Sequence, residues 1–371
     1  MPFVVLHTAD VHLDRAFSAA GMSAGIAAAR RQELRDAFRR FVDLAVDSKV
    51  DAVTIGGDLY EHERATMDTG HFLREQLERL GPVPALVSPG NHDPYMPDSL
   101  YARMDWPPNV TIFREPAFRP VQFSPWLTVW GAGHDGPTLR RNLLEGFRVE
   151  GAGRHVLLFH GSDTRAVPPG KPAHCPFLAS DVRAAGADFA LLGHYHGARV
   201  AEDSAPVFAY PGSPEPLDFS EEGVHHILRL DIDEARISPT LIPFSRVSYC
   251  THTVEVSAFL TSESLRAAIT ALPGEGEIVR VILAGMLQPE VDLDVQSLYN
   301  SCAERFRYLE IVDRTEPGYD FAELAEESTT KGAFVRLMLT RIQRLSPDDR
   351  GTTEAALLYG LRAFERREVS A

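Results

Sequence analysis

The sequence has few cysteines and no long apolar run. Cys175, Cys250 and Cys302 lie far apart in the sequence and form no C-x-x-C pair. We therefore expect buried or inert thiols in a reducing cytoplasm rather than a disulfide framework. No apolar stretch is long enough to span a bilayer, and the short one at the N-terminus is broken by His7 and Asp10, so we expect neither a membrane segment nor a signal peptide.

The sequence also lacks a basic excess, since 37 Lys and Arg face 52 Asp and Glu and the formal net charge is -15. A balance of this sign argues against a generic nucleic-acid-binding protein. It does not exclude a nuclease, because bound divalent cations place positive charge where a phosphate must sit.

What the sequence does contain is a set of apolar runs that each end in side chains able to bind metal ions. Five segments follow this pattern, and a buried β-strand is expected for each run. The runs are Val4–Leu6, Ala52–Ile55, Ala85–Val87, Val156–Phe159 and Phe189–Leu192. The candidate ligands that follow them are Asp10, His12, Asp58, Asn91, His160, His194 and His196. Carboxylate, amide and imidazole groups in this number suit two divalent cations, which predicts phosphoester hydrolysis.

The spacing of the ligands gives each of them an expected part in the site. Asp10 and His12 are two residues apart, so an extended backbone would point both the same way. Asp58 follows two glycines that permit a tight turn, and its two carboxylate oxygens can bridge two ions. Mixed nitrogen and oxygen ligands favour Mn²⁺, Fe or Zn²⁺ over Mg²⁺, and we expect Mn²⁺.

The order of these five blocks closely resembles the calcineurin-like metallophosphoesterase superfamily over residues 3 to 235. The resemblance implies one ion held by Asp10, His12, Asp58 and His196. It implies a second ion held by Asp58, Asn91, His160 and His194. It further implies that His92 is the general acid or transition-state stabiliser. Asp93 is positioned in the sequence to hold the His92 ring by a hydrogen bond. The alternative is that Asp93, which precedes Pro94, serves ordinary turn chemistry.

Within that superfamily the chain looks most like the SbcD-type DNA repair exonucleases. The residues that carry this likeness are His7–Leu13, Gly57–Tyr60 and Tyr210–Pro214. The resemblance implies exonuclease and endonuclease activity on DNA, a homodimer, and an SbcC-like coiled-coil ATPase partner. The chain departs from the family pattern three residues after Asp58, where Glu61, followed by His62, replaces the usual His or Asp.

Short β runs alternate with helical stretches, which predicts an α/β protein with a two-layer β-sandwich flanked by helices. We expect a catalytic domain over 1–250, a small α/β cap over 251–315 and a helical tail over 316–371. Two apolar stripes in the tail could bind helices of an ATPase or pack on the cap. The stripes are Phe334, Leu337, Met338, Ile342 and Leu345, and then Leu357, Leu358, Leu361 and Phe364.

Arg15 lies beside the first ligand block and is a candidate substrate contact. Arginines also recur along one predicted helix, where interleaved acidic residues favour a solvated mixed-charge face over a phosphate-binding stripe. They are Arg30, Arg31, Arg35, Arg39 and Arg40. The remaining histidines are expected to be structural or surface residues.

Three other functions compete with a DNA nuclease. A small-molecule or cyclic-nucleotide phosphodiesterase of the same superfamily needs neither the cap nor the tail. A phosphoprotein phosphatase usually carries Asp-Arg-Gly after the Gly-Asp block, and Tyr60 to Arg64 lacks it. A scaffold without activity has no need for seven ligands. Cleavage of DNA by the purified protein separates the first alternative from the nuclease.

Overall fold

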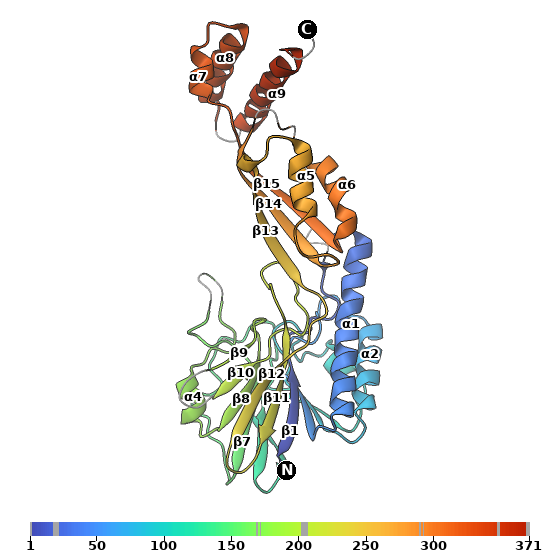
Figure 1. Cartoon of the computed structure of the whole chain (residues 1–371). Coiled ribbons are helices and arrows are strands. Elements are labelled where there is room, and N and C mark those ends of the chain that lie inside the picture. The colour runs from blue at the N-terminus through green and yellow to red at the C-terminus, as the bar shows by residue number, and fades with distance from the viewer. Residues whose placement is uncertain are drawn as a thin grey trace. The chain divides into compact units, whose positions relative to one another are not determined.

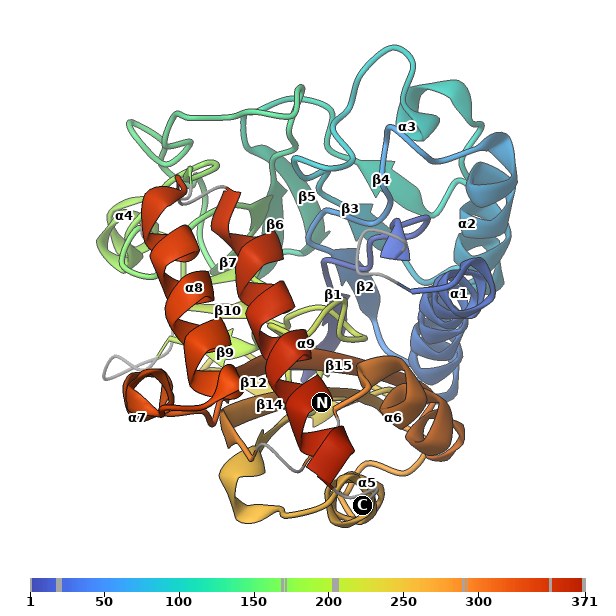
Figure 2. The same cartoon turned by 90° about the horizontal axis from the view of Figure 1, so that it is seen from above.

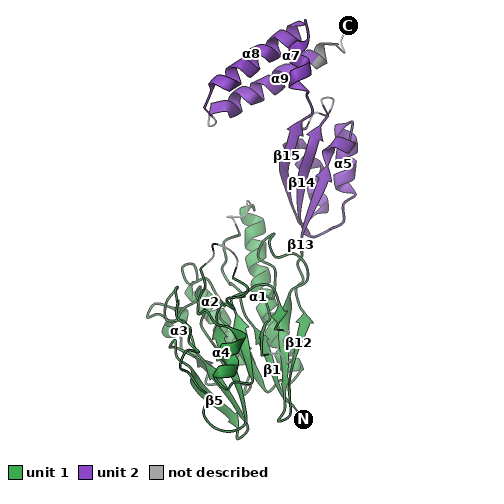
Figure 3. Cartoon of the chain, turned by 90° about the vertical axis from the view of Figure 1, so that its left-hand side faces the viewer, with its two compact units in different colours: residues 1–249 green, residues 250–371 purple. Residues whose placement is uncertain are grey.

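A computed structural model describes residues 2–17, 22–167, 170, 172–201, 207–288, 291, 293–346 and 349–368. The chain divides into two compact units, Met1–Tyr249 and Cys250–Ala371, which Figure 3 shows in different colours. No helix in the described part of the chain is both long and apolar enough to cross a bilayer.

In its described residues, the first unit contains two mixed sheets of six strands each. The first sheet has the order β12-β11-β1-β2-β3-β4, and the second has the order β5-β6-β7-β8-β10-β9. The first sheet consists of β1 (Phe3–Thr8), β2 (Ala52–Ile55), β3 (Ala85–Val87), β4 (Val110–Ile112), β11 (His226–Ile232) and β12 (Ile237–Pro243). The second consists of β5 (Arg119–Ser124), β6 (Leu127–Gly131), β7 (Arg154–His160), β8 (Phe189–Gly193), β9 (Arg199–Val200) and β10 (Phe208–Tyr210).

The two sheets pack face to face through a shared apolar core. Val5 and Leu86 of the first sheet belong to the same buried cluster as Val156 and Leu158 of the second. The intervening residue Leu157 belongs to a different cluster on the other face of the second sheet. Because side chains alternate along a strand, β7 must be apolar on both faces, which explains its uninterrupted apolar run.

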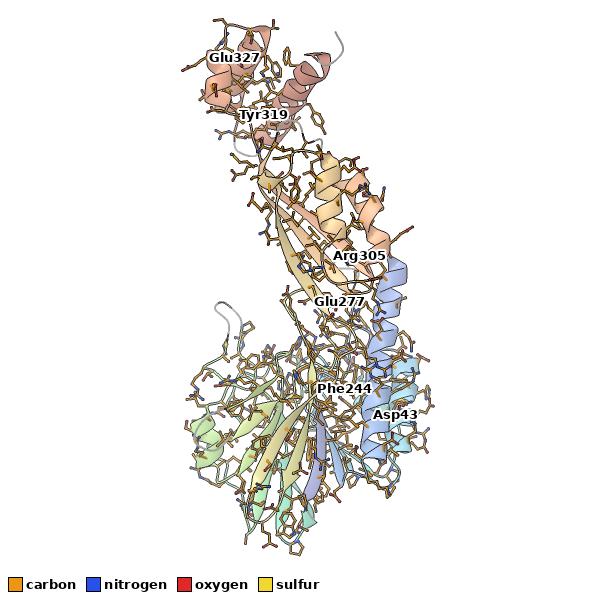
Figure 4. The ribbon with its side chains drawn as sticks, in the orientation of Figure 1. Asp43, Phe244, Glu277, Arg305, Tyr319 and Glu327 are labelled. Atoms are coloured by element: carbon orange, nitrogen blue, oxygen red, sulfur yellow. The ribbon has the colours of Figure 1, made fainter. Side chains whose placement is uncertain are left out.

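Helices complete the first unit. α1 (Ala24–Asp47) and α2 (Met67–Arg79) lie side by side in both cartoon views (Figures 1 and 2). Asp43 of α1, labelled in Figure 4, pairs with Arg79 of α2. The short helices α3 (Leu100–Arg103) and α4 (Ala179–Ala184) follow β3 and β7 respectively.

The second unit contains a small sheet and two groups of helices. The sheet has the order β13-β14-β15, and α5 and α6 supply part of its core. The strands are β13 (Tyr249–Glu255), β14 (Ile278–Leu287) and β15 (Tyr308–Pro317), and the helices are α5 (Ser262–Thr270) and α6 (Val295–Cys302). The remaining helices are α7 (Phe321–Glu326), α8 (Thr330–Arg344) and α9 (Arg350–Glu368).

The two apolar stripes of the tail pack against each other. Met338 of α8 shares a buried cluster with Leu357 and Leu361 of α9. Leu337, which was predicted in the first stripe, is 67% exposed, and Val335 takes the buried place instead. The reason is the helical period of 3.6 residues, which sets position 337 about 100° away from position 338.

The cysteines are buried or half-buried thiols. Cys175 and Cys302 are buried, Cys250 is half-buried, and none of the three forms a disulfide with another described residue. Burial raises the pKa of the Cys175 thiol to about 12, so this thiol stays protonated and unreactive at neutral pH.

Candidate metal centre and general acid

The candidate ligands come together at one end of the two sheets. β1, β2 and β3 are parallel neighbours, and so are β7 and β8 of the other sheet. Asp10, Asp58 and Asn91 follow the carboxyl ends of the first three strands. His160 ends β7, and His194 comes directly after β8. The five strands therefore bring the candidate ligands to the same edge, where open α/β sheets place their sites.

The backbone of the first ligand block differs from the prediction. Asp10 and His12 were expected in extended backbone, but their φ angles are 54° and 51°. Asp58 also has a positive φ, of 52°. Each left-handed residue costs roughly 1–2 kcal/mol. The Asp10 and His12 amides donate to the carbonyls of Gly57 and Asp58, both at 2.9 Å, and these bonds help to hold the two blocks in this conformation.

Gly57 is required for the close approach of these loops. Its φ is 97°, and a Cβ at this position would lie 2.6 Å from His160 Nδ1. The sequence therefore needs glycine here for two reasons, which are backbone conformation and space.

The seven predicted ligands form two groups. In the first, Asp10 lies with His12 and His196, whose Nε2 atoms are 3.2 Å apart. In the second, Asp58 lies with His160 and His194, and His194 Nδ1 is 3.2 Å from His160 Nε2. The seventh, Asn91, places Oδ1 3.0 Å from His160 Nε2 and so joins the second group.

Asp58 lies between the two groups. Its Oδ2 atom is 3.4 Å from His160 Nε2 and 3.7 Å from His12 Nε2. Its Oδ1 atom accepts a hydrogen bond of 2.8 Å from the His92 amide. Burial alone would raise the pKa of Asp58, but the adjacent His160 and His12 side chains hold it well below its ordinary range. The carboxylate is therefore ionised and placed to serve both groups.

The donor set of this centre fits two divalent cations. Imidazole nitrogens of different residues converge at hydrogen-bond distance, and lone pairs that face one another in this way are suited to a shared cation. The ligand residues offer nitrogen, carboxylate and amide donors, a set typical of Mn, Fe or Zn sites. Asp10, His12, Asp58 and His196 would hold one cation, and Asp58, Asn91, His160 and His194 the other.

Glu61 is a site residue whose role the sequence analysis missed. Its Oε1 atom lies 2.9 Å from His12 Nδ1, and its Oε2 atom lies 2.9 Å from His92 Nδ1. The hydrogen bond to Glu61 raises the pKa of His92 to about 9. Burial opposes ionisation of Glu61, but hydrogen bonds to His12 and His92 still lower its pKa. Glu61, which departs from the family pattern, thus orients the His92 ring and favours its protonated form.

Asp93 does not hold the His92 ring, contrary to the prediction. Its carboxylate is fully buried and accepts hydrogen bonds from the amides of Asp58, Leu59 and Gly90 and from the Tyr101 hydroxyl. Four such bonds fix the turn that carries Asp58. Asp93 therefore supports the metal centre through the backbone, while Glu61 takes the role that was expected of Asp93.

Glu221 is a second residue that the sequence analysis missed. Its Oε1 atom lies 2.6 Å from His196 Nδ1. Its Oε2 atom accepts hydrogen bonds from Ser213 Oγ at 3.1 Å and from the Leu217 amide at 2.9 Å. A carboxylate on the far nitrogen of a ligating histidine fixes the tautomer and the ring orientation. No spacing rule in the sequence connects Glu221 to His196, so only the fold shows this pair.

We expect Glu221→Gln to weaken cation binding about 10–100-fold, because His196 loses the carboxylate that orients it. Titration of the metal-free protein with Mn²⁺ by isothermal calorimetry measures this change. Glu222→Gln is the matched control, since Glu222 is the exposed neighbour in the same loop. Equal Mn²⁺ affinity in the Glu221→Gln variant and the wild type would show that Glu221 does not support cation binding through His196.

The arginines near the site contact other parts of the same unit. Arg15, predicted to contact substrate, pairs with Asp218 at 3.1 Å. Arg30, predicted on a solvated face, is fully buried and donates to the Pro216 carbonyl at 2.7 Å. Arg40 pairs with Glu215 at 2.6 Å. These bonds all reach the segment 215–218, so the three arginines hold the loop that leads to Glu221.

Two further histidines lie beside the second group. His134 is buried and its Nε2 lies 3.0 Å from the His160 carbonyl, while the His174 ring lies 5.5 Å from the His194 ring. Burial lowers the pKa of His134 to about 4. His134 is therefore neutral at neutral pH.

Several known proteins resemble this chain in sequence. Metallophosphoesterase YhaO of Bacillus subtilis is 28% identical over 59% of this chain and 54% of its own length. DNA double-strand break repair protein Mre11 of Methanopyrus kandleri is 25% identical over 92% of this chain and 79% of its own length. A subunit of the nuclease SbcCD of Bacillus subtilis is 23% identical over 59% of this chain and 63% of its own length.

The match to YhaO spans about half the length of that relative, and the match to the SbcCD protein less than two thirds. The calcineurin-like phosphoesterase family profile matches residues 3–198, which is more than half of this chain and contains all seven candidate ligands. The chain therefore belongs to the calcineurin-like phosphoesterase family.

Proposed function

We propose that this protein is a two-cation phosphodiesterase that cleaves polynucleotides, as a DNA exonuclease and endonuclease in repair. The observation that carries the proposal is the arrangement around Asp58. One carboxylate lies between two groups of ligands, and a charged histidine, His92, stands at its edge. This arrangement suits attack on a phosphodiester followed by protonation of the leaving oxygen.

When bound, two divalent cations supply positive charge for the phosphate oxygens and lower the pKa of a water molecule. The chain supplies the remaining chemistry. Glu61 bonds the Nδ1 atom of His92, and this hydrogen bond raises the pKa of the ring to about 9, so the ring is protonated at neutral pH. His92 is 45% exposed in its side chain, so it can reach a substrate. His92 therefore serves as the general acid, which donates its proton to the leaving alkoxide.

The choice of a polynucleotide rests on the extent of the likeness to Mre11. The alignment to the Methanopyrus kandleri protein covers 92% of this chain, so it includes most of the second unit as well as the phosphoesterase unit. A relative that shared only the hydrolytic chemistry would align over the first unit alone. The name of that relative, a DNA double-strand break repair protein, then favours DNA as the substrate.

A coiled-coil ATPase partner and a homodimer belong to the same proposal. The Bacillus subtilis relative is named as part of the SbcCD nuclease, which favours a partner for this chain. The tail helices α8 and α9 pack on each other and leave Leu337 and Tyr359 67% and 72% exposed. These side chains make the tail a candidate contact surface for helices of the partner. Mn²⁺ is the proposed native cation.

The net charge of -15 favours a second candidate, a phosphodiesterase for small molecules, because a polyanion is repelled by an acidic protein. One substrate panel separates the two. The Mn²⁺-loaded protein is offered end-labelled duplex DNA, circular single-stranded DNA and bis(p-nitrophenyl) phosphate. We expect cleavage of all three. Cleavage of the small ester alone would replace the nuclease by the second candidate.

A further inference from the structure

We propose that Arg165 and Arg199 form a binding site for a phosphate that flanks the scissile one in a polynucleotide. This inference rests on the proposed function and adds to it a site for the substrate chain. The two arginines are held by one buried carboxylate, Asp163, next to the second group of ligands.

Asp163 is fully buried and binds both guanidinium groups. Its Oδ2 atom lies 3.0 Å from Arg199 Nη1, and its Oδ1 atom lies 3.7 Å from Arg165 Nε. A buried carboxylate is stable only when it is paired, so Asp163 holds the two guanidinium groups in place. The arginine side chains remain 39% and 52% exposed, respectively. Within this cluster of described residues, one negative charge faces two positive charges, which leaves an excess of one positive charge.

Two tyrosines attach this cluster to the ligand loops. The hydroxyl of Tyr195, the residue between ligands His194 and His196, donates to the Asp163 carbonyl at 3.1 Å. The Tyr210 hydroxyl accepts from the Asp163 amide at 3.0 Å and donates to the Gly161 carbonyl at 2.7 Å. Tyr210 opens the Tyr-Pro-Gly-Ser-Pro segment, so this segment has a structural role in the proposed site.

The chain length between these residues limits their distance from the metal centre. Asp163 is three residues after His160, and Arg199 is three residues after His196. Three residues span at most about 11 Å between Cα atoms, which equals the axial rise of roughly three nucleotides in B-form DNA. A phosphate one to a few nucleotides from the scissile bond is therefore within reach of the arginines.

The charges around the centre favour this side for the substrate chain. Glu61 and Glu221 contact His12 and His196, which are ligands of the first group. Arg165 and Arg199 are attached through Asp163 to the loop that follows His160 of the second group. Glu61 is balanced by the protonated His92, so the excess positive charge that attracts a polyanion lies on the second side. Arginine also matches phosphate geometry with two parallel N–H donors.

The test compares the double variant Arg165→Gln/Arg199→Gln with the wild type, both as the full Mn²⁺-loaded chain. The probe is a fluorescein-labelled single-stranded oligonucleotide with phosphorothioate linkages, and fluorescence anisotropy gives its Kd over a series of salt concentrations. We expect the Kd to rise about tenfold, as for the loss of two screened charge contacts. The slope of log Kd against the logarithm of the salt concentration should fall by about one to two.

The matched control is Arg119→Gln/Arg229→Gln, which removes one exposed and one half-buried arginine that also pair with acids. The charge-retaining variant Arg165→Lys/Arg199→Lys should keep most of the salt slope. The kcat and KM for bis(p-nitrophenyl) phosphate, which has no flanking phosphate, should stay unchanged in all variants.

An unchanged Kd and salt slope in the Gln variant would overturn the site, whatever the wild type hydrolyses. Equal losses on the oligonucleotide and the small ester would also overturn it, because they indicate general damage to the centre. A different outcome is that the wild type cleaves no DNA but still binds the oligonucleotide through the two arginines. That result would refute the nuclease function and support the phosphate site.

Discussion

Asp58→Asn is expected to lower kcat/KM on every phosphodiester by at least about 1,000-fold, a loss of roughly 4 kcal/mol of transition-state stabilisation. The reason is that Oδ2 of this one carboxylate lies 3.4 Å from His160 Nε2 and 3.7 Å from His12 Nε2. An amide of the same size removes the negative charge from between the two ligand groups. The measurement is steady-state hydrolysis, with metal content determined by plasma mass spectrometry.

The metal content should fall below two ions per chain in the same variant, because both groups share the lost carboxylate. Asp43→Asn is the control, since Asp43 lies in an exposed ion pair with Arg79 on the helices. Circular dichroism should be the same for both variants and the wild type. If the Asp58→Asn variant binds two ions and its activity lies within tenfold of the wild type, Asp58 does not bridge the two ions.

His92→Ala gives the second large effect, which depends on the leaving group. Loss of a general acid typically costs about 100- to 10,000-fold, and we expect a loss of this size in kcat on an oligonucleotide. The leaving alkoxide of a nucleotide needs a proton, whereas p-nitrophenolate is stable without one. Hydrolysis of bis(p-nitrophenyl) phosphate should therefore decrease much less. The ratio of the two effects is the measurement.

The bound metal should be retained in His92→Ala, because the His92 ring bonds Glu61 and belongs to neither of the two groups of predicted ligands. His62→Ala is the control from the same loop, since His62 faces Asp98 at 3.6 Å. Equal losses on the two substrates would indicate that His92 does not protonate the leaving group. Loss of the metal ions would indicate that His92 has a structural role.

The sequence predicted the architecture of the first unit because its signals are local. Each apolar run, such as Val156–Phe159, is long enough to define a strand that is buried on both faces. The ligands follow those runs directly, so their convergence at one edge follows from the parallel arrangement of the strands. The same reasoning identified the tail stripes but misplaced Leu337.

The sequence could not predict contacts between loops that are distant along the chain. Glu61 and His92 are 31 residues apart, and His196 and Glu221 are 25 apart. Asp93 stands beside His92 in the sequence, yet its carboxylate turns toward the Asp58 turn. The side-chain direction in a loop is set by backbone angles and by tertiary hydrogen bonds, and neither follows from spacing.

The sequence by itself determined which side chains could bind metal ions and that strands would carry them to one place. These properties depend on residue type and on apolar periodicity, which are encoded within each segment. Tertiary structure alone decided which carboxylate holds each histidine and that Asp163 fixes Arg165 and Arg199. Those pairs form between segments that meet only when the two sheets pack together, so no single segment contains the information.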